Sequence, residues 1–434
     1  MGLFDTLRTG ASGLGVAGAN LAVIGDNIAN MNTTGFKKSN ASFADQLPLK
    51  MGTLGGMATI GQGAVPADVR TSFAQGGLMN TGSALDVALT GSGFFMVNQG
   101  DQTMYTRDGS FQLDDNGYLM TSTGFNVQGY SAQGGQVSPT LSDMRIDMGP
   151  SDPKATTEVT MDMVLSPTAD LEDNLTGLRM DGSAGAATVA DVSGAADFTT
   201  SATVYDSLGN PHDVVVAFER VGESDWKWSA VVPAGETNVG EGDAALEIAS
   251  GELAFDGDGK LASSTQSKGS KSWKWPGAKS FAFDLNLGGN DAPGGVRMQN
   301  DSETSSVTSL TQDGASVGSI AGLSVDDTGS IIAQYTNGDE AVLGQLALAN
   351  FSAEGGLVRT GGNMYAASPA SGEPAVGAPG VSGRGSVVGY ALERSNVDLE
   401  AEFVSMIQAQ RSYQANAGII RTADETLQEL VNLV

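Results

Sequence analysis

The chain has 434 residues, and its 50 Asp and Glu residues outnumber its 22 Lys and Arg residues, giving a formal net charge of -28 at pH 7. This balance argues against nucleic acid or an anionic membrane surface as a partner, because phosphate binding needs clustered basic side chains. Cysteine is absent from the sequence, which excludes disulfide bonds, thiolate metal sites and a cysteine nucleophile. The length is sufficient for two or three domains with sizeable cores.

The first thirty residues do not read as an ordinary secretory signal. They lack a basic start, a continuous apolar core and a small-residue cleavage site. No apolar run approaches the roughly 18 residues that a membrane span needs. We therefore expect either a cytoplasmic protein or one exported by a route that reads no cleaved signal, and no insertion into a membrane.

A first helix is predicted from about Leu3 to Ala29, and it ends in a cluster of turn-forming residues at 30–35. Its apolar residues recur every seven positions in two columns, the pattern of a helix whose seam is covered by other helices. The first column is Leu7, Leu14, Leu21 and Ile28, and the second is Leu3, Gly10, Ala17 and Ile24.

Four glycines interrupt this helix, at Gly10, Gly13, Gly15 and Gly18. Each costs about 1 kcal/mol relative to Ala, so the isolated helix should be weak. We interpret them as places where a neighbouring backbone comes close, rather than as signs of a frayed segment.

Between the first helix and residue 390, short apolar stretches alternate with turn signals, which predicts β structure. Shifts in composition divide this region into a connecting segment, an inner β domain made of two stretches, and an outer inserted β domain. We expect these at 31–70, at 71–149 with 302–390, and at 150–301. The outer domain holds all four Trp residues.

One turn pattern recurs in the β region: an apolar residue, Asp, two residues, Gly, one residue and a second apolar residue. It begins at Leu113, Phe255 and Val325. The Asp side chain can bond its own turn backbone, and Gly takes the positive φ that closes a hairpin. These three segments are therefore predicted to be hairpin turns.

A last helix is predicted after Ser395-Asn396-Val397-Asp398, which fits the capping-box pattern. Its seven-residue column is Leu399, Met406, Tyr413, Ile420, Leu427 and Val434. Four residues after these positions stand Phe403, Gln410, Ala417, Asp424 and Val431. Gln410 and Asp424 either set the register inside an assembled bundle or simply flank the seam in water.

The fold class expected is mixed and mainly β, with the terminal segments 1–30 and 395–434 pairing as a coiled coil around two β-rich domains. One chain offers only two such seams, so we expect them to meet each other and copies from neighbouring molecules. The residues predicted to carry this assembly are Leu3, Leu7, Leu14, Leu21, Ile24, Ile28, Leu399, Phe403, Met406, Tyr413, Ile420 and Leu427.

Signals for catalysis or metal binding are weak. The single histidine, His212, has no second His with which to form a metal site, so a solvent-facing or strand-edge position is favoured. Asp256 and Asp258 faintly resemble a calcium loop, but the third acid and the distal Glu are missing, so a hairpin turn is the better interpretation. We expect no enzyme activity, no metal and no cofactor.

The ends of the chain resemble the flagellar hook, rod and hook-associated axial protein family of bacteria. The N-terminal signature is Asn-Ile-Ala-Asn-Met-Asn-Thr-Thr-Gly-Phe-Lys at 27–37, and its C-terminal counterpart is Ser-Asn-Val-Asp-Leu at 395–399, followed by 406–417. The residues that carry the motif are Asn27, Asn30, Thr33, Gly35, Phe36, Ser395, Asn396, Asp398, Gln410 and Arg411. Interior matches at 105–109 and 204–212 are most similar to the hook branch of this family.

The resemblance implies a structural subunit of the hook, a flexible curved tube that transmits motor torque to the filament. It implies polymerisation with copies of itself, an extracellular location after flagellar type III export without signal cleavage, and contacts with the distal rod, the hook cap, the hook–filament junction and the export apparatus. Two alternatives stay open. One is another axial component such as a rod protein with an insertion, and the other is an oligomeric extracellular β-rich binding protein or carbohydrate-active enzyme.

Overall fold

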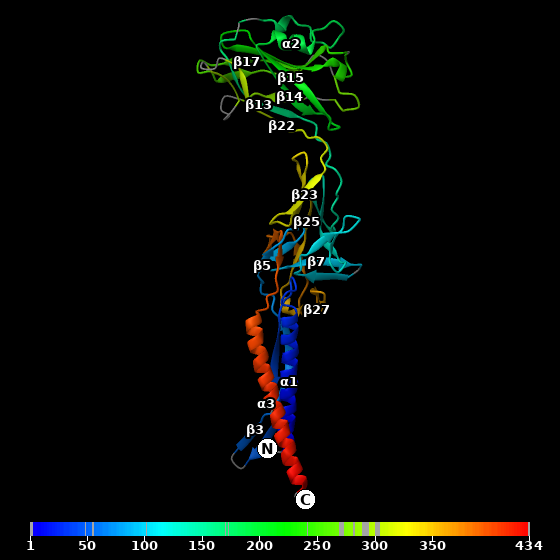
Figure 1. The fold of residues 1–434 in the computed structure, drawn as a ribbon, viewed down its shortest axis with the longest axis vertical. Coiled ribbons are helices and arrows are strands. Elements are labelled where there is room, and N and C mark those ends of the chain that lie inside the picture. The colour runs from blue at the N-terminus through cyan, green and yellow to red at the C-terminus, as the bar shows by residue number, and fades with distance from the viewer. Residues whose placement is uncertain are drawn as a thin grey trace. The chain divides into compact units, whose positions relative to one another are not determined.

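The computed structural model describes residues 3–47, 49–53, 56–100, 102–169, 171, 173–240, 242–268, 273–280, 283–288, 295–299 and 304–432. The chain divides into two compact units, which are treated separately below (Figure 1). Unit 1 comprises residues 1–148, 321–334 and 340–434, and unit 2 comprises 149–320 and 335–339. Among the described residues, no helix combines the length and apolarity that crossing a membrane requires.

The two terminal helices lie side by side in unit 1, drawn in blue and in orange to red in Figure 1. They are α1 (Leu3–Ala29) and α3 (Leu399–Asn432). The pair is antiparallel, since Gly10 near the start of α1 lies against Ile420 late in α3. The predicted fold class, mainly β with paired terminal helices, is confirmed, and so are the predicted limits of the first helix. Val434 lies outside the described residues, and so does the side chain of Leu3.

The predicted connecting segment at 31–70 forms strands rather than an irregular linker. Strand β1 (Ser39–Asp45) pairs antiparallel with β4 (Ala64–Thr71) in a two-stranded ribbon. Strands β2 (Leu49–Thr53) and β3 (Gly56–Ile60) form a second hairpin. An isolated two-stranded ribbon is only marginally stable in water, and β1 and β4 gain support by packing on α1.

The β region of unit 1 is built on β7 (Phe94–Gln99), which pairs with β8 and β11. Successive side chains of a strand point to opposite faces of the sheet. Phe94 and Met96 accordingly enter one apolar cluster and Phe95 and Val97 enter another, so both faces of this strand are covered. A continuous apolar run thus marks a strand that is buried on both sides.

The remaining strands of this region are short and pair mostly antiparallel. They are β5 (Leu78–Asn80), β6 (Val87–Thr90), β8 (Gln102–Thr106), β9 (Phe111–Leu113), β10 (Leu119–Thr121), β11 (Asn126–Gln133), β12 (Gln136–Asp143), β23 (Ile320–Val325), β24 (Ser330–Tyr335), β25 (Glu340–Leu346), β26 (Leu348–Asn350), β27 (Val358–Gly361), β28 (Met364–Ala366), β29 (Ala375–Gly377), β30 (Ser386–Gly389) and β31 (Ala391–Glu393).

Unit 2 contains a sheet with the strand order β14-β15-β16-β17-β18. One face packs on the larger core, to which all four Trp residues contribute. The other face packs on α2 (Val189–Ala195), whose buried Val192 meets Ala217 of β15. Strand β22 pairs with β13, which places residues 302–320 in unit 2 although the composition shift suggested a boundary after 301.

The strands of unit 2 are β13 (Glu158–Leu165), β14 (Phe198–Tyr205), β15 (Pro211–Arg220), β16 (Asp225–Pro233), β17 (Ala245–Phe255), β18 (Leu261–Ser264), β19 (Ser267–Lys268), β20 (Asp284–Asn286), β21 (Val296–Met298) and β22 (Ser306–Gln312).

The predicted hairpin turns are confirmed. At the second of them, Oδ1 of Asp256 accepts hydrogen bonds from the backbone N–H of Asp258 at 3.0 Å and of Lys260 at 2.8 Å, and Gly259 has φ 75°. The same bonds form at the first and third turns, from Asp114 and from Asp326. The sequence analysis did not identify a fourth turn with the same hydrogen bonds, in which the Asp is at 206 and the Gly at 209.

The expectation for His212 is wrong in one respect, because its ring does not face solvent. The ring stacks on Trp275 with centroids 4.0 Å apart and planes inclined by 9°, and its side chain is only 16% exposed. Its Nε2 lies 3.4 Å from Oδ2 of Asp206. Stacking on a neighbouring aromatic side chain, which no local signal indicates, decides this position.

Candidate assembly interface

Two glycines of α1 lie against larger side chains of α3 where the helices meet. A Cβ atom added at Gly10 would lie 3.1 Å from Cγ1 of Ile420, and one at Gly13 would lie 2.7 Å from the side chain of Asn416. Side-chain size at the contact sets how closely two helix axes approach, so these glycines allow a close approach. The buried residues that recur at intervals of seven are Gly10, Ala17, Ile24, Glu402, Ala409 and Ala423.

The predicted approach of a neighbouring backbone is confirmed at Gly10, where an added Cβ would lie 3.6 Å from the carbonyl oxygen of Asn416, whereas at Gly13 the close atoms belong to the side chain of Asn416. At Gly15 and Gly18 an added Cβ would meet no atom within 4 Å in the described part of this chain, so for these two glycines the close approach stays a prediction about contacts with other copies.

The predicted assembly residues are only partly covered within one chain. Phe403 and Tyr413 are 47% and 41% exposed, whereas Ile24 is 4% exposed. A straight helix drifts by about 20° per heptad relative to a seven-residue repeat, so one column cannot face one partner helix along its whole length. The half-buried members are Leu7, Leu14, Leu21, Ile28, Leu399, Met406, Ile420 and Leu427. Within one chain, these apolar side chains keep surface available for contacts with other chains.

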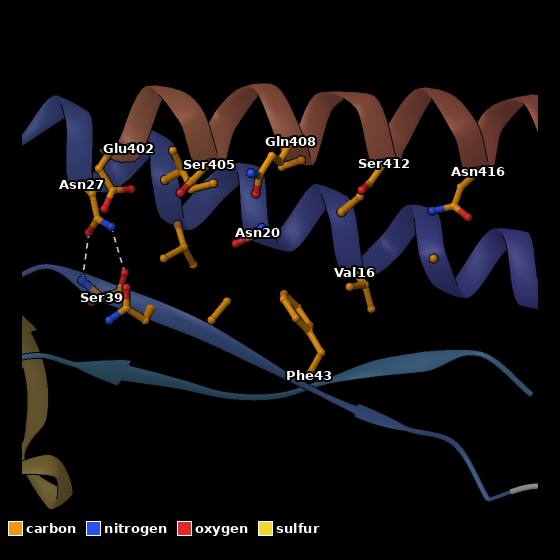
Figure 2. A pocket seen from close by; sticks show the side chains of 17 residues that line it. Val16, Asn20, Asn27, Ser39, Phe43, Glu402, Ser405, Gln408, Ser412 and Asn416 are labelled. Atoms are coloured by element: carbon orange, nitrogen blue, oxygen red, sulfur yellow. Dashed lines mark hydrogen bonds between the residues drawn. The ribbon is translucent and has the colours of Figure 1, made fainter. Parts of the chain in front are cut away.

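A groove of about 470 Å³ lies between α1, α3 and β1 (Figure 2). Asn27 and Glu402 stand at one end and Asn416 at the other, with Asn20 and Phe43 between them. The lining is mixed, because α3 contributes mainly polar side chains, whereas α1 and β1 contribute both apolar and polar ones.

Asn27 fixes the ribbon to α1. Its side chain is 1% exposed, its Nδ2 donates to the carbonyl of Ser39 at 2.8 Å, and its Oδ1 accepts from the N–H of Ser39 at 2.9 Å. An amide side chain can satisfy both backbone groups of one residue in this way, which a hydroxyl or a carboxylate cannot do as well. This motif residue therefore sets where β1 begins.

The motif residues after Asn27 turn the chain into β1. Asn30 donates to the carbonyl of Asp26 at 2.9 Å and accepts from the hydroxyl of Thr33 at 3.2 Å. Gly35 has φ 67°, and an added Cβ there would lie 2.6 Å from the backbone nitrogen of Asp108. Both the left-handed conformation and the close approach exclude other residues.

Phe36 is buried beneath the turn that joins α1 to β1. Its side chain is 1% exposed, and the guanidinium of Arg359 lies over its ring at 4.7 Å. Arg359 also contacts Oδ2 of Asp26 at 2.9 Å. The start of the ribbon is thereby held against both α1 and β27.

The start of α3 differs from the predicted capping box. The N-terminal cap is Asp398, whose Oδ1 accepts from the N–H of Glu400 at 3.0 Å and of Ala401 at 3.2 Å. Ser395 lies three residues earlier, and its hydroxyl accepts from the N–H of Val397 at 3.4 Å. The prediction of Ser395 as the cap is wrong, because α3 begins only at Leu399, and the side chain of Asn396 between Ser395 and Asp398 is bound to other segments.

Asn396 joins three separate segments. Its Oδ1 accepts from the N–H of Lys38 at 2.8 Å, and its Nδ2 donates to the carbonyls of Ser72 and Ala74 at 2.9 Å each. The chain enters α3 at a point where the ends of β1 and β4 meet. By contrast, the motif residues Gln410 and Arg411 are exposed on α3 in the single chain, and both roles predicted for Gln410 stay open until copies assemble.

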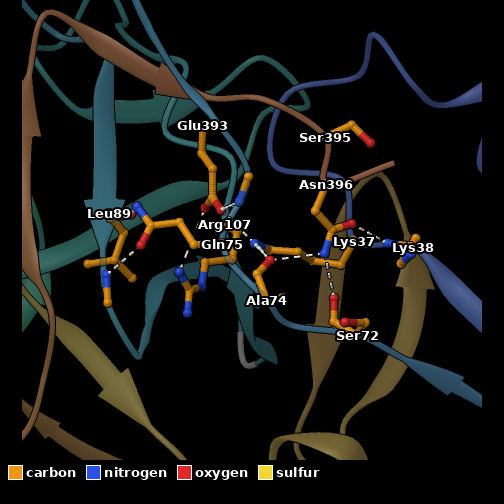
Figure 3. Close-up of polar contacts among 12 residues, drawn as sticks. Lys37, Lys38, Ser72, Ala74, Gln75, Leu89, Arg107, Glu393, Ser395 and Asn396 are labelled. Carbon is orange, nitrogen blue, oxygen red and sulfur yellow. Dashed lines mark hydrogen bonds and ion pairs between the residues drawn. The ribbon is translucent and has the colours of Figure 1, made fainter. Parts of the chain in front are cut away.

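A buried ionic cluster lies beside Asn396 (Figure 3). Nζ of Lys37 contacts Oε1 of Glu393 at 2.6 Å and donates to the carbonyl of Ala74 at 2.9 Å. The same Oε1 accepts from the N–H of Gly76 at 2.7 Å, and Oε2 lies 3.7 Å from Nη1 of Arg107. Burial lowers the pKa of Lys37 and of Arg107, and the charge of Glu393 opposes this shift in both.

The ionic cluster includes residues that the sequence reasoning did not select. Lys37 and Glu393 are 356 positions apart, and their side chains are 0% exposed. The sequence did contain a signal for a buried charge, since the charged residue Glu393 directly follows the apolar run that ends at Leu392. No local pattern identifies its partner. The cluster connects the exit from the turn after α1 to the entry into α3.

A pair of terminal helices with half-covered apolar columns, tied through a buried ionic cluster to the β region of unit 1, is the architecture of a structural assembly subunit. Comparison with known proteins makes this class specific. The chain is 33% identical to the flagellar hook protein FlgE of Escherichia coli strain K12 over 97% of this chain and 98% of that protein. It is 35% identical to that of Salmonella typhimurium, with 97% and 98% covered, and 33% identical to that of Treponema pallidum, with 99% and 100% covered.

Family models match along most of the chain. They are described as flagella basal body rod protein at 7–37, flagellar hook protein FlgE/F/G D1 domain at 88–163, flagellar basal body protein FlaE D2 domain at 174–315, and flagellar basal body rod FlgEFG protein C-terminal at 388–433. The chain belongs to the flagellar hook protein family, a family of structural proteins.

Among solved structures, the chain is similar to a crystal structure of Helicobacter pylori flagellar hook protein FlgE2. The TM-score is 0.46 at 14% sequence identity, with 71% of this chain and 98% of that chain covered.

Proposed function

We propose that this protein polymerises through its terminal helices into the flexible curved tube of the bacterial flagellar hook, which transmits motor torque to the filament. The observation that carries the proposal is the exposure of large apolar side chains on a helix that is otherwise paired, of which Phe403 at 47% is an example. Such a seam is stabilised when other helices cover it. Membership of the hook protein family supports the same assignment.

In the proposed tube, the terminal helices at 1–30 and 395–434 line the inner wall and the segment at 31–70 connects them to the inner β domain. With residues 302–320 assigned to the inserted domain, the inner β domain comprises 71–148 and 321–390, and the inserted domain lies outermost. The predicted assembly residues form contacts between copies, and the motif residues Asn27 and Asn396 hold the helices to the ribbon. The partners are copies of the chain, the distal rod, the hook cap, the hook–filament junction and the export apparatus. The location is the extracellular hook, reached without a cleaved signal.

A rod-like axial component is the second candidate, because two of the matching family models are described as basal body rod proteins. The match of a D2 domain model to the insert at 174–315 favours the hook. Deleting the gene distinguishes the two candidates. Intact basal bodies that lack hooks would support the hook assignment, and basal bodies that lack a distal rod would support the alternative.

Electron microscopy of the purified protein tests polymerisation directly. The full chain should form curved tubes, and truncation of 3–28 or of 399–434 should abolish them while both truncated chains keep the tryptophan fluorescence of folded unit 2. Tubes formed by either truncated chain would refute the role of the helices. Discrete particles with ligand turnover would instead support the binding-protein or enzyme alternative.

A further inference from the structure

Helix α3 presents two opposite faces that one chain leaves uncovered. On one face, Ser405 and Ser412 line the groove beside α1 and β1. On the other face stand Phe403, Val404 and Ile407, whose exposed fractions are 47%, 56% and 51%. With 3.6 residues per turn, the centres of these two faces are separated by roughly 160° around the helix axis.

The apolar patch formed by Phe403, Val404 and Ile407 is local. The next turns of the same face carry the exposed side chains of Arg411 and Gln414. A solvent-facing helix surface ordinarily shows polar residues. Three large apolar side chains exposed side by side on such a surface therefore indicate a contact site rather than a random distribution.

The groove has a shape that suits this patch. Its lining is mixed. Apolar side chains such as Val16 and Phe43 come from α1 and β1, and polar side chains such as Ser405 and Ser412 come from α3. Large apolar side chains of another molecule that lie against the apolar part would remove further apolar surface from water. The volume of about 470 Å³ is sufficient for more than one side chain.

We propose that the patch at Phe403, Val404 and Ile407 docks into the groove between α1, α3 and β1 of a second copy of this chain. The proposal rests on the proposed polymerisation and specifies its surfaces. Because patch and groove lie on opposite faces of one helix, the contact is heterologous: each bound copy offers a free groove or a free patch to the next. Repetition of such a contact builds an open helical polymer, whereas a two-fold contact would end at a dimer.

Paired cysteine substitutions test the contact, because the natural chain has no cysteine. Ile407→Cys combined with Asn20→Cys places one thiol in the patch and one in the groove. The two positions face away from each other within one chain, which excludes an intramolecular bond. Oxidation of assembled tubes should give a ladder of covalent multimers on a non-reducing gel. The matched control combines Ile407→Cys with Ala22→Cys, which is two residues along α1 and outside the groove.

The outcomes separate the inference from the function on which it rests. A ladder with Asn20→Cys and none with Ala22→Cys supports the docking. Tubes that give no ladder with Asn20→Cys, or an equal ladder with Ala22→Cys, overturn the docking and leave polymerisation intact. A full-length natural chain that forms no tubes overturns the proposed function, and the docking with it.

A second measurement avoids cysteines altogether. Ile407→Glu should raise the concentration needed for tube formation about tenfold or more, which corresponds to about 1.4 kcal/mol per contact. Gln414→Glu adds the same charge to the same face beyond the patch and should change that concentration less than about twofold. Glu has a high helix propensity, so far-UV circular dichroism should show α3 intact in both. Equal effects of the two substitutions would overturn the docking.

Discussion

Unit 2 and the terminal helix pair of unit 1 bury their apolar residues to very different extents. In unit 2, Trp226 and Trp228 are 0% and 1% exposed, inside a core that the sheet covers on one side. In the helix pair, Gly10 and Gly13 lie against Ile420 and Asn416, while Phe403 remains 47% exposed. One region completes its own core, and the other completes only part of it.

The difference follows from the geometry of the elements. A sheet with a core on one face and a helix on the other hides a wide apolar surface within one chain. Two helices cover only one stripe of each other, so any wider apolar face needs more helices. The helix pair is therefore held to the rest of unit 1 by polar groups, namely Asn27 and the cluster of Lys37 and Glu393, more than by an apolar core. This comparison predicts different responses to mutation in the two units.

The four Trp residues make the comparison measurable, because all of them lie in unit 2. Tryptophan fluorescence reports the unfolding of unit 2 alone. Hydrogen exchange of peptides from 3–47 and 399–432 reports the helix pair and the ribbon.

The largest effect is expected for Glu393→Ala. This substitution leaves the cations of Lys37 and Arg107 buried without their acid, which typically costs about 3–5 kcal/mol. Hydrogen exchange in unit 1 should speed up accordingly, and the fluorescence midpoint of unit 2 should not change. The exposed Glu425→Ala on α3 is the control. Unfolding of unit 2 while unit 1 keeps its slow hydrogen exchange would contradict the prediction that this cluster stabilises unit 1.

A smaller loss is expected for Asn27→Ala. It removes both hydrogen bonds to the buried backbone of Ser39 and leaves that N–H and carbonyl without their partner, at a cost of about 2–3 kcal/mol. Exchange at 39–45 should rise before exchange elsewhere in unit 1. Asn30→Ala removes hydrogen bonds that are exposed and should cost less than about 1 kcal/mol. Equal effects of the two substitutions would show that the ribbon does not depend on the side chain of Asn27.

Glycine substitutions in α1 test which faces of this helix are covered within one chain. Gly18→Ala should stabilise the helix by about 1 kcal/mol, because an added Cβ meets no atom within 4 Å. At Gly13 the same change places a Cβ 2.7 Å from the side chain of Asn416, which must move, so the gain should be cancelled. Hydrogen-exchange rates of the backbone amides in α1 measure the effects of both substitutions. A less stable α1 in Gly18→Ala would refute the prediction, and a stable α1 that forms no tubes would identify Gly18 as a packing position between copies.

The smallest effect concerns pH and unit 2. The side chain and backbone of Thr157 and the backbone of Glu158 donate hydrogen bonds to Asp313, and these outweigh the opposing effect of burial and lower its pKa to about 2 from 3.8. The stability from this carboxylate is therefore present above pH 3.8 and is lost as the pH falls toward 2. Discounted for solvent screening, it is about 1 kcal/mol or less. Asp313→Asn should lower the fluorescence midpoint at pH 7 and not at pH 2, and a difference that persists at pH 2 would rule out this cause.

Much of the fold could be predicted from local patterns. The limits of α1 and the three Asp–Gly hairpins agree with the structure, because caps, turns and helical periodicity depend on residues a few positions apart. The candidate assembly interface was harder to predict from the sequence. Reading the seam as one column overlooked the drift of a straight helix, which leaves Tyr413 41% exposed. Selecting Ser395 as the cap overlooked Asn396, whose bonds to Ser72 and Ala74 belong to the tertiary structure.

By itself the sequence determined that the chain carries two terminal helices with seven-residue apolar columns and a β-rich interior, and its motifs resembled the family to which it belongs. The buried contact of Lys37 with Glu393 across 356 positions, and the packing of Gly10 and Gly13 against α3, come only from the tertiary structure. Local interactions act over a few residues and leave a pattern along the chain. Long-range contacts depend on how whole elements meet in space, and that geometry leaves no such pattern.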